Sequence, residues 1–326
     1  MPLLLSRSDV THVLDMADCI DVVEKAFVEL ASGTAELPVR IALTPPNGWA
    51  SYMPAYLEGL GALACKVVTV YKNNPSKHNL PTTIGKVLLQ DPETGDVVCI
   101  MDGGYLTAVR TGAASGVATK HLARDDKGQV AGIFGAGAQA RAQLWAITVA
   151  RDLSRAHVYD AVAEAADRFT DEMSRKLDLE IIVADSPESI LEHADIICTA
   201  TSSPTPVFDG DKVRPGTHLN GIGSHTPTTR ELDTAILKRA KFIADSTEAC
   251  LKEAGDLIIP IQEGAVTEAH IHAELGEIVT GSKSARENDE EITLFKSIGL
   301  AIQDVAAAKL VYDRARQAGI GIEIEL

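Results

Sequence analysis

The chain has 326 residues, 45% hydrophobic and 23% charged, which is the composition of a globular protein long enough for two domains. Its 46 Asp and Glu residues outnumber 30 Lys and Arg residues, and the net charge of −16 argues against binding to a nucleic-acid backbone. No run approaches the roughly 18 apolar residues of a membrane span, and the short apolar run near the N-terminus lacks the basic residues of a signal peptide. We therefore expect a cytoplasmic protein that binds neither nucleic acid nor membrane.

The cysteines and histidines give little sign of a metal site. The five cysteines are scattered and form no CxxC pair, so they predict neither a disulfide framework nor a zinc site. His270 and His272 form an H-x-H pair without a third ligand in the pattern. We expect no metal.

The first hundred residues predict one helix followed by a meandering sheet. Apolar residues recur at helical spacing from Met16 to Leu30, and Gly33 stands where the helix should end. The runs "PVRIALTP", "SYMPAYL" and "LACKVVTVYK" are rich in β-forming residues. "KVLLQDPETGDVVCIMDG" has the pattern of a hairpin, with two apolar runs joined by a polar turn.

Beyond a predicted helix at 106–123, strands and helices alternate. Such alternation predicts an α/β fold with a doubly wound parallel sheet, the Rossmann arrangement. A final helix over 299–319 could pack back on the first domain. We expect an α+β domain of residues 1–117 with 300–326 and a Rossmann domain of residues 118–299. The buried-type strands expected in the second domain are 129–135, 155–160, 179–185, 195–201, 217–223 and 241–246, with helices such as 138–150 and 163–177 between them.

The stretch "GAGAQA" matches the dinucleotide-binding pattern G-x-G-x-x-G/A between a strand and a helix. Gly135 allows the tight turn, Gly137 lets backbone amides approach a pyrophosphate, and Ala140 lets the helix lie close to the strand. Ala138 and Gln139 begin the helix, whose N-terminus attracts phosphate. The alternative is a purely structural glycine turn.

The next predicted strand ends at Asp160, 20 residues after Ala140. A carboxylate in this place accepts hydrogen bonds from the adenosine ribose and repels a 2′-phosphate, so we expect NAD(H) to be preferred over NADP(H). The alternative for Asp160 is a solvent-exposed residue at a strand end. By their positions at later strand ends, the other residues expected to border the cofactor are Thr201, Ser202, Asn220, Gly221 and Gly223.

Several motifs in order along the chain resemble the ornithine cyclodeaminase/mu-crystallin family: "MDGGYLTAVRTGAAS", "GAGAQA", "HLNGIGSHTPTTRELD" and "FKSIGLAIQDVAAAKLVYD". The family includes cyclodeaminases, an archaeal-type alanine dehydrogenase and imine reductases. The resemblance implies a homodimer in which the N-terminal domain binds substrate and pairs the subunits, while the central domain binds NAD(P).

The resemblance assigns four residues to a substrate carboxylate. Arg40, Thr82 and Arg110 match carboxylate ligands of the family, and Lys66 matches its active-site lysine. Two arginines and a lysine can fix a carboxylate through charge-assisted hydrogen bonds, and Lys66 could also move a proton. The alternatives are a surface charge for Arg40 and a solvated strand face for Lys66.

Two positions depart from the cyclodeaminase pattern. His225 stands where cyclodeaminases carry an aspartate, and Ser51 stands where they carry a glutamate. Because the distal ammonium of ornithine then has no counter-ion, we expect an NAD-dependent oxidoreductase that interconverts a small α-amino acid with its imino or keto acid. His225 is a candidate proton donor, since an imidazole titrates near neutral pH, and the alternative is a histidine that only fills space in its loop. The alternatives are a cyclodeaminase with recycled NAD and a non-catalytic, crystallin-like nucleotide-binding protein.

Overall fold

The computed structural model describes residues 1–325, which form two compact units. Unit 1 comprises residues 1–111 and 300–325, and unit 2 comprises residues 112–299. The helix predicted at 106–123 is α4, Gly103–Leu122, which runs from the first unit into the second. Within residues 1–325, no helix has both the length and the apolar character that a membrane span requires.

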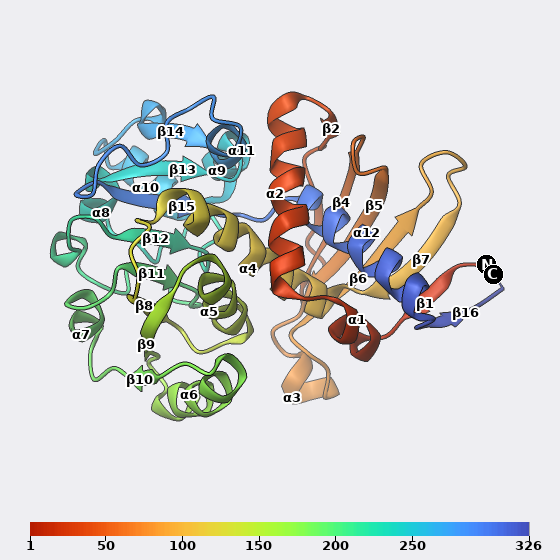
Figure 1. The fold of residues 1–326 in the computed structure, drawn as a ribbon, viewed down its shortest axis with the longest axis horizontal. Helices are drawn as coiled ribbons and strands as arrows, with labels where there is room; N and C mark the ends of the chain where they lie inside the picture. Colours follow the sequence, from red (N-terminus) through yellow and green to blue (C-terminus); the bar gives the residue numbers. More distant parts are fainter. Residues whose placement is uncertain (326) are drawn as a thin grey trace. The chain divides into compact units, whose positions relative to one another are not determined.

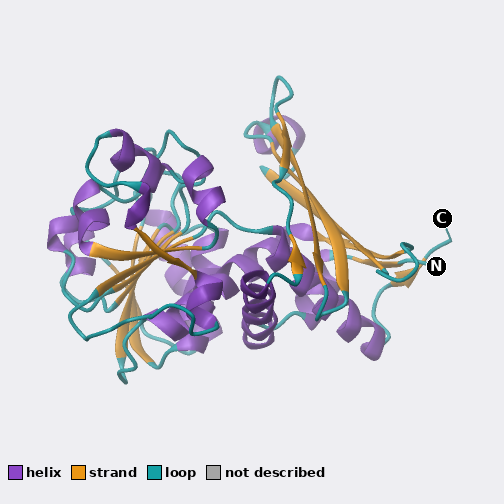
Figure 2. Ribbon diagram, turned by 90° about the horizontal axis from the view of Figure 1, so that it is seen from above, coloured by secondary structure: helices purple, strands orange, loops and turns teal. Residues whose placement is uncertain are grey.

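Unit 1 is a mixed sheet with helices α2 and α12 packed on one face (Figures 1 and 2). The strand order is β16-β1-β7-β6-β5-β4-β2, with β3 paired to β4, and every pair is antiparallel except β1 with β7. The elements are β1 Leu3–Leu5, α1 Arg7–Val13, α2 Met16–Ser32, β2 Ala35–Glu36, β3 Ile41–Leu43, β4 Trp49–Leu57, β5 Ala62–Val70, α3 Asn74–His78, β6 Thr83–Gln90, β7 Val97–Asp102, α12 Ala301–Ala318 and β16 Ile322–Glu323.

Local sequence explains the main elements of unit 1. The Asp15 side chain accepts the amide of Ala17 at the start of α2, and Gly33 ends the helix at φ +74°. The predicted hairpin is confirmed as β6 and β7, with Gly95 at φ +76° in its turn. The predicted final helix is α12, whose small, buried alanines let it lie against β4, β5 and α2. The short strand β1 was not predicted.

Unit 2 is an eight-stranded parallel sheet with helices on both faces (Figure 2). Its order is β10-β9-β8-β11-β12-β15-β13-β14, so the first five places follow the Rossmann pattern. The six predicted strands are confirmed, and β14 and β15 are additional. The elements are β8 Gln129–Phe134, α5 Ala138–Ala150, β9 Leu153–Tyr159, α6 Ala163–Leu177, β10 Ile181–Val183, α7 Pro187–Leu191, β11 Ile196–Thr199, η1 Gly210–Lys212, β12 His218–Gly221, α8 Thr234–Arg239, β13 Ala240–Ala244, α9 Thr247–Glu253, α10 Gly255–Gln262, η2 Glu268–His270, β14 Ile271–Glu274, α11 Leu275–Val279 and β15 Ile292–Lys296.

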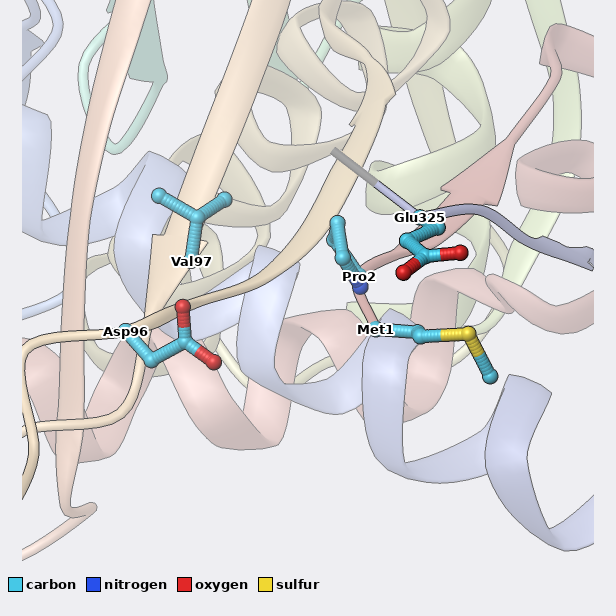
Figure 3. Close-up of a pocket in the computed structure, with 5 residues that line it drawn as sticks. All are labelled: Met1, Pro2, Asp96, Val97 and Glu325. Carbon is cyan, nitrogen blue, oxygen red and sulfur yellow. The ribbon is translucent and has the colours of Figure 1, made fainter.

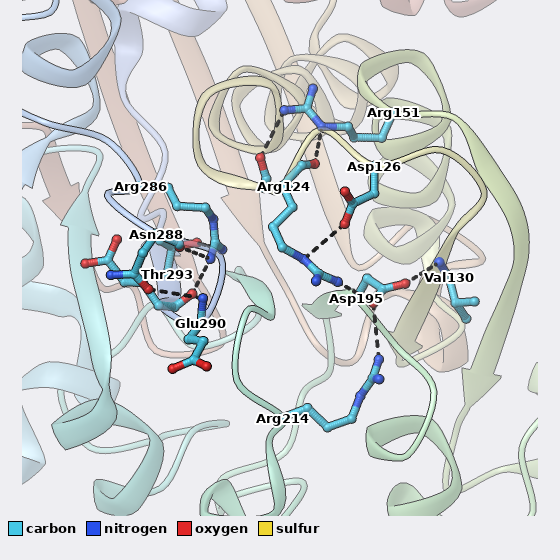
Figure 4. Close-up of polar contacts among 12 residues, drawn as sticks. Arg124, Asp126, Val130, Arg151, Asp195, Arg214, Arg286, Asn288, Glu290 and Thr293 are labelled. Carbon is cyan, nitrogen blue, oxygen red and sulfur yellow. Dashed lines mark hydrogen bonds and ion pairs between the residues drawn. The ribbon is translucent and has the colours of Figure 1, made fainter.

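A group of arginines ties loops together at the amino ends of these strands (Figure 4). Arg124 and Arg214 both donate to Asp195, at 2.9 and 3.2 Å, and Asp195 accepts the amide of Val130 at the start of β8. Arg151 donates to the carbonyl of Arg124, just beyond α4. Because these bonds lie at the sheet edge opposite the glycine loop, they stabilise the unit and leave the carboxyl edge for a ligand.

Candidate active site

Lys66 projects from β5 toward α12, and its side chain is 1% exposed. Its Nζ lies 2.6 Å from Oδ2 of Asp304, which is fully buried on α12. An unpaired ammonium would be costly in so buried a place, so the carboxylate partner explains why a lysine is tolerated there. The solvated strand face considered for Lys66 is therefore wrong.

Arg110 on α4 shares the same carboxylate. Its Nε donates to Oδ1 of Asp304 at 2.8 Å, and its Nη1 donates to Oε1 of Gln303 at 2.5 Å. Arg110, Gln303 and Asp304 are all buried. These bonds fix the plane of the guanidinium, and its Nη2 offers two further N–H donors on the same rigid fork.

The cluster of Lys66, Arg110 and Asp304 carries a net positive charge while Lys66 is protonated. Burial, followed by repulsion from Arg110, lowers the pKa of Lys66 to about 7, and Asp304 opposes both effects. Arg40 also lowers the pKa of Lys66, so the Arg40 charge acts on the cluster. A buried excess of positive charge suits an anionic ligand such as a carboxylate.

Arg40 and Thr82 are both half-buried at the margins of β3 and β6. The Thr82 carbonyl accepts the amide of Tyr71 at 2.8 Å, which fixes the turn before β6. The structure thus groups Lys66 and Arg110 through Asp304, and Arg40 through electrostatics. For Thr82 the ligand role stays a prediction.

Sequence reasoning missed Asp304 and Gln303. Both are fully buried on α12, where their neighbours are alanine, isoleucine and valine. Two adjacent polar residues inside the apolar stretch "LAIQDVAAA" were the signal that could have revealed them, because buried polar groups need partners.

A cavity of about 430 Å³ near the two chain ends is a poorer candidate for a carboxylate ligand (Figure 3). Its lining is Met1, Pro2, Asp96, Val97 and Glu325, with two acidic side chains. The buried cations of unit 1 are not part of that lining.

In unit 2, the glycine loop has the geometry that a dinucleotide requires. Gly135 adopts φ +99°, and a Cβ there would lie 2.7 Å from the carbonyl oxygen of Ala200. Gly137 is the N-cap of α5, and a Cβ there would meet open space. Ala140 is fully buried, as close helix packing requires. The residues present therefore fit a pyrophosphate at the α5 N-terminus, where Ala138 and Gln139 begin the helix.

Asp160 lies directly beside this loop. Its Oδ2 accepts the amide of Ala136 at 2.8 Å, and its Oδ1 accepts the amide of Val162 at 2.9 Å. The carboxylate therefore has a structural task in shaping the loop. A carboxylate has about four acceptor sites, so it can accept ribose hydroxyls as well.

The other predicted cofactor residues lie at the ends of β11 and β12. Thr201 and Gly223 donate to one buried carboxylate, Glu231, which sequence reasoning did not identify. Ser202 is exposed next to Thr201, and Gly221 is buried at the end of β12. The side chain of Asn220 points inward, and its Nδ2 donates to Oγ1 of Thr119 at 3.1 Å, which is a structural contact.

The predicted proton donor His225 is exposed on the loop after β12, with Nδ1 3.0 Å from the carbonyl oxygen of Gly223. His270 and His272, the H-x-H pair, each direct Nε2 at a backbone carbonyl, of Leu237 and Ser284 respectively. Among residues 1–325, no three metal-binding side chains come together.

A Rossmann unit with this glycine loop, in a chain that also holds a buried cation cluster, defines a nicotinamide-dependent oxidoreductase. The chain matches the ornithine cyclodeaminase/mu-crystallin family over residues 1–319 and belongs to that family, as the motifs indicated. It is 40% identical over 326 residues to the Δ1-pyrroline-2-carboxylate reductase of Bacillus cereus, with 99% of each chain covered.

Two solved structures share the whole fold. Δ1-Pyrroline-2-carboxylate reductase of Thermococcus litoralis, in complex with NADH and L-proline, has a TM-score of 0.95 and 48% identity, covering 99% of this chain and 100% of that chain. An archaeal alanine dehydrogenase dimer with bound NAD has a TM-score of 0.94 and 37% identity, covering 100% and 99%. The protein is an enzyme that uses an NAD-type cofactor on CH–NH2 or C=N groups and interconverts a small α-amino acid with its imino or keto acid.

Proposed function

We propose that this enzyme reduces a cyclic α-imino acid of the Δ1-pyrroline-2-carboxylate type to the cyclic amino acid, with NADH as the reductant. The observation that carries the proposal is the buried cluster of Lys66, Arg110 and Asp304, which has an excess positive charge suited to one carboxylate when Lys66 is protonated. The 40% and 48% identities to reductases of this substrate support it.

Unit 1 is the substrate-binding unit in this proposal. Arg110 Nη2 donates to the substrate carboxylate, because Asp304 and Gln303 already orient the guanidinium through Nε and Nη1. Arg40 adds a second cation, and Thr82 adds a hydroxyl donor. Fixing the carboxylate fixes the adjacent imine carbon, and such positioning can contribute several kcal/mol to the barrier reduction, on the order of 7–11 kcal/mol in ideal cases.

Lys66 is the proton donor in this proposal. Reduction of a C=N bond adds a hydride to carbon and requires a proton on nitrogen. The bound nicotinamide supplies the hydride. A lysine whose pKa is lowered to about 7 loses its proton more readily near neutral pH than an ordinary lysine, as a general acid must. His225, exposed on its loop, is the second candidate for this step.

Unit 2 is the cofactor-binding unit in this proposal, and Asp160 makes it prefer NADH to NADPH. The carboxylate of Asp160 adjoins the glycine loop, and residues 161–167 contain no arginine or lysine to neutralise a 2′-phosphate. Thr201, Ser202, Gly221 and Gly223 border the remainder of the cofactor, whereas the predicted Asn220 is buried and donates to Thr119.

Cyclodeamination is the less favoured function. Ser51 is fully buried on β4 and offers a hydroxyl group, and His225 offers an imidazole, so neither provides the negative charge that a distal ammonium needs. A cyclic imino acid has no distal ammonium, so Ser51 and His225 need not supply a counter-ion for it.

We also propose that unit 1 forms a homodimer through the sheet face opposite α2 and α12. A row of half-buried apolar side chains crosses five strands on that face, and the exposed Ile41, Tyr52 and Leu43 adjoin it. An apolar sheet face of this extent is typical of a protein interface. The row is Leu4, Ile100, Leu88, Cys65 and Pro54.

A substrate panel tests the proposed function. NADH oxidation is followed by absorbance with Δ1-pyrroline-2-carboxylate, with its six-membered homologue, and with pyruvate plus ammonia. We expect the cyclic imino acids to give the highest kcat/KM. A higher kcat/KM for pyruvate plus ammonia would make the enzyme an amino-acid dehydrogenase, and proline formation from ornithine without net NADH would make it a cyclodeaminase.

A further inference from the structure

Glu231 is a fully buried carboxylate that joins the loops following β11 and β12. Its Oε1 accepts both the amide and the hydroxyl of Thr201, each at 2.6 Å. Its Oε2 accepts the amides of Gly223 and Ser224, at 2.7 and 3.2 Å. Oε1 therefore accepts hydrogen bonds from the loop after β11, and Oε2 accepts them from the loop after β12.

All four partners are hydrogen-bond donors, so the contacts fit the ionised carboxylate. Burial raises the pKa of Glu231 above its usual value, and Lys296 and the Thr201 donors offset only part of that rise. Gly223 must be glycine for this arrangement, since a Cβ there would lie 2.3 Å from the Thr201 carbonyl oxygen and 2.5 Å from Oε1 of Glu231. The loops are thus packed tightly around the carboxylate.

A second buried pair holds Glu231 in place. Asp256 accepts the backbone amides of Glu231 and Leu232, at 2.7 and 2.9 Å, and forms a 2.8 Å ion pair with Lys296. Asp256 and Lys296 are both fully buried. Such a support, built from costly buried charges, is the kind found where loop geometry must be rigid.

We propose that Glu231 is a positioning residue for the cofactor: it clamps the loops of Thr201 and Gly223 in the arrangement that receives the dinucleotide. In parallel α/β sheets, ligands bind at the carboxyl ends of the strands, where both loops lie. The proposal rests on the proposed function, which places those loops against NADH. Glu231 acts through the loops and does not itself touch the cofactor.

Glu231→Gln is the informative variant. Whichever way the amide is oriented, its NH2 group faces the donors of one loop, so that loop loses its acceptor. Glu231→Asp keeps the charge but shortens the side chain, so it cannot reach both loops. Glu263→Gln is the matched control, because Glu263 is an exposed carboxylate that also has two donor partners, Arg230 and Thr234.

The experiment is a fluorescence titration of the full-length protein with NADH, which gives both the Kd and the number of sites per folded chain. We expect both Glu231 variants to raise the NADH Kd by about tenfold or more, the size of one lost hydrogen bond to a charged group. Glu263→Gln should bind as the wild type does. A role in folding alone would lower the number of binding-competent chains and the melting temperature without changing the Kd of the folded fraction.

The two proposals fail differently. If the wild-type protein binds NADH and both Glu231 variants bind it with a Kd within twofold of the wild-type value, the positioning role is overturned. If one variant does not fold, the other decides by the same criterion. If the wild-type protein does not bind NADH, both the proposed function and the positioning role of Glu231 are wrong.

Discussion

Replacing Asp304 by asparagine should lower the pKa of Lys66 and move the pH dependence of catalysis. Burial and Arg110 lower the pKa of Lys66 to about 7, and the ion pair with Asp304 limits the fall. Asparagine is nearly the same size and keeps an oxygen for Arg110, but it removes the negative charge. Lys66 should therefore lose its proton at a lower pH.

The size of the effect follows from the 2.6 Å contact between Lys66 Nζ and Asp304 Oδ2. A hydrogen bond to a charged group contributes about 1.5–3 kcal/mol. Since one pKa unit corresponds to about 1.4 kcal/mol, the pKa should fall by about one to two units. If Lys66 donates the proton, activity is lost as pH rises through that pKa, so the alkaline limb should move from near pH 7 to about pH 5–6.

The assay is the pH profile of kcat/KM for imino-acid reduction in the wild type and in Asp304→Asn. Asp313→Asn is the control, because Asp313 pairs with Lys309 on the exposed side of the same helix. That control should keep the wild-type profile. An alkaline limb at the same pH in Asp304→Asn and in the wild type would refute the reasoning and move the proton transfer to another group, such as His225.

Four further predictions test the sites separately. Arg110→Ala should cost about 2–5 kcal/mol of transition-state stabilisation in kcat/KM and leave the NADH Kd unchanged; a parallel loss of NADH affinity would make Arg110 structural. Asp160→Ser should raise kcat/KM for NADPH relative to NADH, and equal values for both cofactors in the wild type would contradict the assignment. The pKa of Lys66 is about 7 in the folded protein and 10.5 in the reference state, so the unfolded chain binds more protons between those values. The unfolding free energy of the wild type should therefore rise with pH across that window relative to that of Lys66→Met, by up to about 1.4 kcal/mol per pH unit. Chemical denaturation at several pH values measures both proteins, and the same pH dependence of unfolding free energy in both would refute the prediction. Val67 lies on β5 two residues from Cys65, on the sheet face opposite α2 and α12. Val67→Glu should therefore convert the dimer to monomers, as light scattering would show, and a monomeric wild type would contradict the proposed interface.

The regular elements were predictable because their signals are local. Helices α5 and α6 begin and end at the predicted residues, because each is an uninterrupted run of helix-forming residues that closely follows a strand. Strand β15 was missed because it ends in Lys296, a charge that argues against a fully buried strand. Only the fold supplies the reason, which is the ion pair with Asp256.

The candidate site was predictable where a motif carried it. Lys66, Arg110 and the glycine loop followed from recognisable stretches of sequence. Asp304 did not, because its role depends on a contact with Arg110 that spans 194 residues of chain. Glu231 lies in a quoted motif, yet its function arises from four donors on two separate loops.

The central claim is that NADH delivers a hydride to the imine carbon of a cyclic imino acid. The most direct test incubates the enzyme with Δ1-pyrroline-2-carboxylate and NADH carrying deuterium at C4 of the nicotinamide, on the face that the enzyme uses. Mass spectrometry of the product should show proline with one deuterium at Cα for each NADH oxidised. Proline without deuterium, or no proline while NADH is bound, would contradict the account.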